Sequence, residues 1–352
     1  MENKIQIAFA AINDRVEANI PSAAEVEIKG KEFISWGDNN NYPDFLYSLY
    51  TECPTLQSIV NGITDFVKGN KITSTIGDIE DDYAKCVVDY VLTGAFALQV
   101  IENKSGQISK VKWVDIRNLR SNKDNTVFFY SEDWSKSYGR VKTVGIPKFI
   151  KGVSQPTSIL VVKNPQSRST YPVVSWGSAI RAALTEIEIS KFHLNEICNN
   201  FSGSAVINFN NGVPTDEQKD EIERAVNKKF TGAGNAGRFL LTFNDSADNA
   251  VTVTRLGTDD FDKRYEALAK KTRQELFTAF RANPNLFGIP TENLGFSQEE
   301  YEGAFRLFNR TVVKPIIKLL CGAFDTIYGK ENTVTVEPFS LDENNNAEET
   351  VS

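Results

Sequence analysis

Hydrophobic spacing divides the chain into a first part of short apolar runs and a second part of long helices. Residues 42–69 place an apolar side chain every three to four positions, which predicts a helix. Pro54 should split it, because proline breaks an inner helical turn, and Gly69 suits its C-terminal cap. The other elements predicted in this part are a helix over 81–93, a hairpin of 96–101 and 108–115 around Lys104-Ser105-Gly106, and strands over 127–130 and 158–162.

Two long apolar stripes flank a compact segment in the second part. The first stripe predicts a helix from Trp176 to Phe201, and the second predicts one from about Asp259 to Arg281. Between them, Thr215 and Gln218 form a T-x-x-Q capping box for a shorter helix. This segment is predicted to hold strands 205–209, 239–243 and 250–255, with the shorter helix ending near Phe230 and a glycine loop after it.

A third long helix is predicted from Ser297, which forms a capping box with Glu300, to Tyr328. Pro315 lies inside this helix and should kink it. The tail from Glu331 is acidic and rich in asparagine, and we expect it to be disordered after one short strand at 333–336.

These elements predict an α+β fold in which two long helices carry a small α/β unit between their ends, as a stalk carries a tip. One subunit cannot cover both faces of a long amphipathic helix pair, which favours copies packed side by side in a closed ring. The predicted segments are 1–175, 176–201, 202–257, 258–282, 283–296, 297–328 and 329–352.

Composition supports a folded, soluble protein that does not grip nucleic acid. Of 352 residues, 41% are apolar, 23 are Phe and 24% are charged, which is enough for a substantial core. The net charge is −7, whereas binding to a phosphate backbone needs clustered Lys and Arg. An acidic surface remains compatible with DNA that slides past without being held.

Candidate chemistry is sparse. The four cysteines are far apart without metal-ligand spacing and are expected to be free core thiols in a reducing cytoplasm; His193 is the only histidine. We therefore expect no metal, no cofactor and no catalytic relay. No apolar run approaches a membrane span, and residues 1–11 are a poor signal peptide and a plausible strand, so cytoplasmic synthesis without membrane attachment is expected.

The sequence does not encode either of two common nucleotide-binding motifs. Residues 232–237 fit G-x-G-x-x-G, but this loop follows a predicted helix and precedes a strand, which reverses the dinucleotide order. No P-loop sequence is present, so an energy source for pumping DNA would have to be another protein. The helical carboxylates Glu186, Glu188, Glu299, Glu300 and Glu302 are interpreted as solvated helix faces.

The order of elements resembles the portal proteins of tailed bacteriophages, in which two stem helices flank a small clip. The resemblance covers roughly residues 30–328. Local motifs that resemble the family are Trp36-Gly-Asp-Asn-Asn-Asn-Tyr-Pro43 and Thr55-Leu-Gln-Ser-Ile-Val-Asn-Gly62 (wing), Trp176-Gly-Ser-Ala-Ile-Arg181 (first stem helix), Gly234-Asn-Ala-Gly237 (clip), and Leu286-Phe-Gly-Ile-Pro290 with Gly295-Phe-Ser297 and Phe308 to Pro315 (tunnel loop to wing helix).

The resemblance implies a ring of twelve copies at one capsid vertex, through which double-stranded DNA is packaged and ejected. It implies as partners the terminase, a major capsid or scaffold protein and a head–tail connector protein, with residence in the virion after assembly in the host cytoplasm. The crown that often follows the wing helix is minimal or absent here. The resemblance places Asn283, Pro284, Asn285, Leu286 and Asn293 in the tunnel loop, and Gly232, Gly234, Asn235 and Gly237 at the clip surface that contacts terminase or adaptor.

Lys270, Lys271 and Arg273 form a small basic cluster on the second long helix. One interpretation is transient contact with DNA phosphates in the channel. We favour the other, an exposed face that pairs with acids of a neighbouring copy, such as Asp220 or Glu221, because the cluster is short and the protein is acidic.

Twelve copies at −7 each carry −84, so the channel is expected to repel DNA and to work by low friction. Two alternatives stay open: another head–tail connector or scaffold protein, and an enzyme of nucleic-acid metabolism, for which no catalytic constellation was found.

Overall fold

The computed structural model describes residues 20–134, 142–165, 170–198, 205–209, 239–243, 261–289 and 298–340, with Thr215, Gln218 and Glu221. The chain forms two compact units, one of residues 1–178 with 277–352 and one of residues 179–276. With 48% helix and 20% strand, the fold is of the predicted α+β class.

The first two helices follow the predicted apolar spacing. Helix α1 (Tyr42–Glu52) and helix α2 (Pro54–Lys68) are separated at Cys53, whose backbone is extended, so Pro54 begins the second helix as predicted. Gly69 ends α2 with φ of 64°, and a Cβ there would lie 2.1 Å from the carbonyl oxygen of Glu337. Only glycine therefore allows this close approach of the two backbones.

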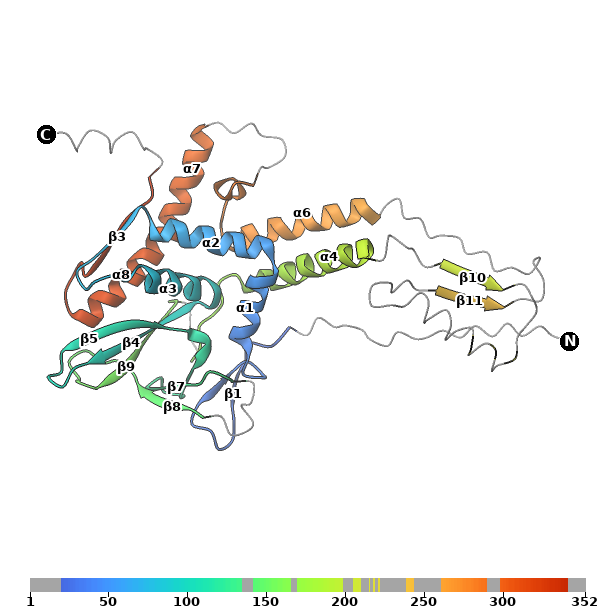
Figure 1. Cartoon of the computed structure of the whole chain (residues 1–352). Helices are drawn as coiled ribbons and strands as arrows, with labels where there is room; N and C mark the ends of the chain where they lie inside the picture. The colour runs from blue at the N-terminus through green and yellow to red at the C-terminus, as the bar shows by residue number, and fades with distance from the viewer. Residues whose placement is uncertain are drawn as a thin grey trace. The chain divides into compact units, whose positions relative to one another are not determined.

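A three-stranded antiparallel sheet forms the base of the first unit. Strand β4 (Ala95–Glu102) lies between β5 (Ile108–Val114) and β9 (Thr157–Lys163), which confirms the predicted hairpin. Helix α3 (Glu80–Thr93) packs on β4 and β5, while α2 packs on α3 (Figure 1). The apolar side chains of β4 and of α2 are almost all buried between these layers.

Smaller sheets complete the N-terminal part. Strands β6 (Leu119–Ser121), β7 (Val127–Tyr130) and β8 (Val144–Pro147) form an antiparallel sheet after the short 3-10 helix η1 (Ile116–Asn118). Strands β1 (Glu25–Glu27) and β2 (Ile34–Trp36) form a separate hairpin. Lys148, just after β8, bridges to Ile159 of β9 and links the two three-stranded sheets.

The C-terminal helix departs from the single kinked helix that was predicted. It is divided into α7 (Gln298–Phe308), a π-helical segment η5 (Asn309–Val313) and α8 (Lys314–Tyr328). Pro315 has no N–H for the preceding turn, and the π segment ends just before it. After α8, strand β12 (Val334–Glu337) pairs with β3 (Lys71–Ser74), near the predicted strand at 333–336; the tail beyond residue 340 lies outside the described residues.

The second unit contains the two long helices, α4 (Ile180–Cys198) and α6 (Phe261–Ala279). The predicted start of the first helix was wrong: Trp176 precedes it, and the 3-10 turn η2 (Gly177–Ala179) leads into α4. Strands β10 (Ala205–Phe209) and β11 (Phe239–Phe243) form where predicted and pair in parallel. The capping box is also confirmed, since the Thr215 N–H donates to Gln218 Oε1 at 3.1 Å; the predicted strand 250–255 is outside the described part.

Three of the four cysteines are described with their side chains. Cys53 and Cys86 are buried and Cys321 is half-buried, and none of the three forms a disulfide. Across the residues that the structure describes, no helix is both long and apolar enough to cross a bilayer. Within the same residues, no group of three or more His, Cys, Asp or Glu side chains could hold a metal ion.

Candidate functional site

The segment of residues 179–276 leaves the first unit and returns to it at one place. Trp176, just before the departure, stacks on Phe280, just after the return, with ring centroids 5.7 Å apart. Trp176 is fully buried, and its indole Nε1–H donates to the Leu92 carbonyl oxygen at 3.0 Å. The excursion is therefore an insertion whose two ends are fixed side by side in one core.

Helices α4 and α6 lie alongside each other within the second unit (Figure 1), and aromatic side chains join them. Phe192 of α4 stacks on Tyr265 of α6 at 4.7 Å between ring centroids, and His193 meets the same ring edge-on. This histidine thus serves a packing role in the helix pair.

The apolar stripes are buried near one end of these helices and exposed to solvent further along. Ile187 of α4 and Leu276 of α6 are buried. Leu194 on α4 is 60% exposed, however, and Phe192 and Leu268 are each 38% exposed. A single copy therefore leaves apolar surface uncovered on both helices, as the sequence predicted for a helix pair that needs neighbours.

The predicted basic cluster lies on the exposed surface of α6. Lys270, Lys271 and Arg273 are all exposed, and Lys271 forms an ion pair with Glu275 one turn away at 3.8 Å. An exposed pair of this kind contributes little stability. The exposed position agrees with both interpretations of the cluster, so the contact that it makes stays a prediction.

The segment after α6 is more ordered than the predicted loop. Residues Pro284–Phe287 form the 3-10 helix η4, and Asn283 caps it by accepting the Asn285 N–H on its Oδ1 at 3.1 Å. Leu286 is buried, so its side chain faces the core, while Asn283, Pro284 and Asn285 are partly exposed. Asn293 lies outside the described residues, as do the predicted clip residues Gly232, Gly234, Asn235 and Gly237.

Phe287 anchors this segment to the first unit. Its ring meets those of Phe66, Phe277 and Phe308, with centroids 5.5 to 6.0 Å away. It lies so close to α2 that a Cβ on Gly62 would be 2.5 Å from the ring. Glycine at this helical position is therefore required by the ring that packs on it, and the base of the loop is held rigidly.

A buried carboxylate that the sequence did not single out joins several elements. Asp89 of α3 accepts hydrogen bonds from the Tyr47 hydroxyl, from Trp113 Nε1 at 2.8 Å and from the Ile116 N–H at 3.3 Å. Burial raises the pKa of Asp89 to about 7, although the three hydrogen bonds favour the charged form and act in the opposite direction. The one feature of the sequence that could have pointed to Asp89 is its position among the apolar residues of the helix predicted over 81–93.

A buried arginine forms hydrogen bonds with the asparagine-rich motif after β2. Asn40 has a positive φ of 58°, and its Oδ1 accepts the Trp36 N–H at 2.9 Å. The guanidinium of Arg120 donates to both the side-chain and the main-chain oxygen of Asn40, and its remaining bonds go to the carbonyls of Arg117 and Leu119. The motif is thus a structural joint between β2 and β6.

Comparison with solved structures identifies this architecture. A chain in the neck of a native gene transfer agent particle, computed with C12 symmetry, superposes with a TM-score of 0.52 at 17% identity, covering 85% of this chain and 84% of that one. A phage portal protein of the HK97 family from Corynebacterium diphtheriae superposes with a TM-score of 0.50 at 9% identity, covering 82% and 92%. The chain has the fold of a phage portal protein.

Sequence comparison adds little to the portal fold. No protein-family model matches the chain. An uncharacterized protein of Rickettsia bellii (strain RML369-C) is 24% identical over 143 residues, which is 40% of this chain and 35% of that protein. The match thus spans about a third of that relative's length.

Proposed function

We propose that this chain is a portal protein: a structural subunit that assembles into a ring at one capsid vertex and catalyses no reaction. The supporting observation is the insertion of residues 179–276, whose ends meet at Trp176 and Phe280 and whose helices leave Leu194 and Leu268 exposed. Side-by-side copies would cover these apolar side chains, and a closed ring would do so without open ends.

The elements take portal roles in this proposal. Residues 1–175 and 297–328 form the wing, α4 and α6 are the stem helices, and residues 202–257 are the clip. Residues 283–296 form the tunnel loop, in which Asn283, Pro284, Asn285 and Asn293 would face the channel. Leu286 is left out of this set because its side chain is buried.

The ring would conduct double-stranded DNA during packaging and ejection and would dock first terminase and then connector proteins through the clip. Twelve copies are proposed because a structural neighbour was computed with C12 symmetry. At −7 per copy the ring would carry −84, which opposes tight binding of DNA. Passage with low friction is therefore the proposed mechanism.

Electron microscopy of the purified particle tests the ring directly. We expect end-on views with rotational symmetry and an axial channel; compact particles without a channel would refute the proposal. Double-stranded DNA binding at physiological salt tests the mechanism separately. We expect no more than weak binding, whereas tight binding that falls steeply with added salt would contradict low friction.

A further inference from the structure

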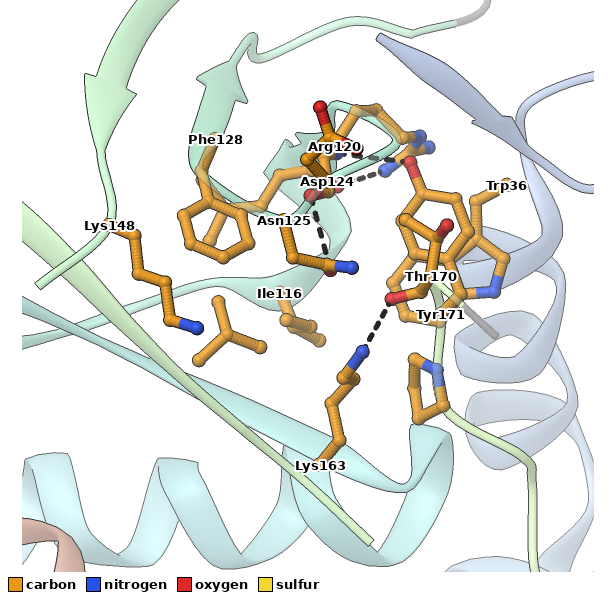
Figure 2. Close-up of a pocket in the computed structure, with 14 residues that line it drawn as sticks. Trp36, Ile116, Arg120, Asp124, Asn125, Phe128, Lys148, Lys163, Thr170 and Tyr171 are labelled. Atoms are coloured by element: carbon orange, nitrogen blue, oxygen red, sulfur yellow. Dashed lines mark hydrogen bonds between the residues drawn. The ribbon is translucent and has the colours of Figure 1, made fainter. Parts of the chain in front are cut away.

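A cavity of about 350 Å³ opens in the first unit, and all of its lining residues belong to that unit. Ile116, Phe128 and Val161 contribute apolar side chains to its lining, and we call these three residues its apolar floor. Trp36 and Tyr171 close another side, with their rings stacked at 4.5 Å and an interplanar angle of 9°. Figure 2 shows these side chains around an open centre.

Two lysines reach this centre from different strands. Lys148 follows β8 and Lys163 ends β9, and in Figure 2 both ammonium groups point into the cavity. Lys163 Nζ donates to the Thr170 carbonyl oxygen at 2.9 Å. Burial lowers the pKa of Lys163, Glu25 partly offsets this, and the charge of Lys148 lowers it further, so the two ammonium groups repel each other.

The charge of the cavity is opposite to that of the whole chain. Its lining carries three cations, Arg120, Lys148 and Lys163, against the single carboxylate of Asp124, while the chain has a net charge of −7. Arg120 is committed to Asn40 and to two main-chain carbonyls. Among the residues that the structure describes, no carboxylate lies within ion-pair distance of Lys148, which is therefore available to a ligand.

An apolar floor beside converging ammonium groups selects a ligand with an apolar body and an adjacent anion. The volume is at the small end of ligand sites, enough for one or two side chains and too little for a dinucleotide. We propose that this cavity binds an acidic peptide segment of another protein. Its carboxylate would lie between Lys148 and Lys163, and a neighbouring apolar side chain would pack on Val161 and Phe128.

Calorimetric titration of the full-length protein with N-acetyl-glutamyl-phenylalanine amide tests this assignment. We expect saturable binding with a Kd on the order of 1 mM, as befits so small a probe. The neutral glutaminyl analogue should bind at least about tenfold weaker, because it lacks the charge that the lysines attract. Lys148→Glu should lower the affinity for the acidic probe by about tenfold or more. Lys110→Glu, at an exposed lysine outside the cavity, should leave this affinity unchanged.

A second variant separates the cavity from general surface charge. Val161→Phe keeps every charge but fills the floor, and it should also remove binding of the acidic probe. Equal binding of the acidic and neutral probes, or equal losses in Lys148→Glu and Lys110→Glu, would overturn the assignment. Tighter binding of phenyl phosphate than of the dipeptide would overturn it as well, in favour of a phosphate-bearing small molecule. Because none of these readouts depends on ring assembly, a failure here leaves the portal proposal untouched.

Discussion

The indole of Trp176 stacks on the ring of Phe280 with an interplanar angle of 19°, although 103 residues of chain separate them. One residue precedes α4 and the other follows α6, so the contact fixes the departure and the return of the whole insertion. The Trp176 Nε1–H bond to Leu92 ties this point to the end of α3. The geometry of the insertion thus depends on a contact inside the first unit.

Trp176→Phe should destabilise the protein by about 1–3 kcal/mol, because it leaves the buried Leu92 carbonyl without its donor while keeping an aromatic ring. Urea unfolding of the variant and the wild type measures the loss. Tyr50→Phe is the matched control, since it removes an exposed bond to Asn61 and should change stability by less than about 0.5 kcal/mol. Equal urea-unfolding midpoints for the two variants would show that the hydrogen bond from Trp176 to Leu92 does not stabilise the fold.

Gly62→Ala should lower the melting temperature, although alanine favours helices by about 1 kcal/mol over glycine. The new methyl group would clash with Phe287, and overpacking typically costs about 1–3 kcal/mol. Gly322→Ala in α8 is the matched control, because its Cβ would meet nothing within 4 Å and should be neutral or stabilising. If both variants gain stability alike, Phe287 does not hold the base of the loop rigidly.

Asp89→Asn should stabilise the protein increasingly as the pH rises from about 4 to 7. The folded-state pKa of Asp89 is raised to about 7 by burial, so its contribution to stability is full below the unfolded-state pKa and is lost as the pH rises through 7. The wild-type protein should lose folding free energy on the order of 4 kcal/mol through Asp89 over this pH range. The asparagine Oδ1 can keep accepting from Trp113 Nε1 and the Ile116 N–H, and its amide N–H can donate to the Tyr47 hydroxyl oxygen, so the site is satisfied without a charge.

The measurement is the difference in unfolding free energy between Asp89→Asn and the wild type across this pH range. Taking the difference cancels the other carboxylates. Asp65→Asn, which removes an exposed carboxylate on α2, is the matched control, and the gain in stability should be larger for Asp89→Asn. A flat profile for Asp89→Asn would show that this carboxylate is not desolvated in the folded state.

The sequence predicted elements whose causes are local. The split at Pro54, the cap at Gly69 and the capping box of Thr215 and Gln218 all follow from residues within one or two helical turns. The apolar stripes also predicted that one subunit would not cover both faces of the helix pair, and Leu194 and Leu268 are indeed exposed.

Features that depend on distant partners could not be predicted in the same way. Trp176 was placed in a helix because its spacing fits the stripe, but its stacking partner and its hydrogen-bond acceptor are remote in sequence. Likewise, Arg120 meets Asn40 across 80 residues, and Leu286 turns inward because Phe66 and its aromatic neighbours hold the adjacent Phe287. The spacing of apolar residues along a single helix or strand cannot predict contacts between segments so far apart in the sequence.

Aspartate at both Leu194 and Leu268 should prevent assembly without unfolding the subunit. Both side chains are exposed in one copy, so charge there is tolerated by the monomer but would be buried between copies. We expect unchanged helical circular dichroism and loss of the large species in size-exclusion chromatography. Val153→Asp, at another exposed apolar position, is the control and should assemble normally. Assembly of the double variant would exclude these stripes from the interface.

Native mass spectrometry of the purified wild-type protein tests the ring most directly. Twelve copies of 39.3 kDa predict a particle of about 470 kDa. A stable species of 39.3 kDa at all concentrations would contradict the account, because the bare stripes of α4 and α6 would then have no neighbour to cover them.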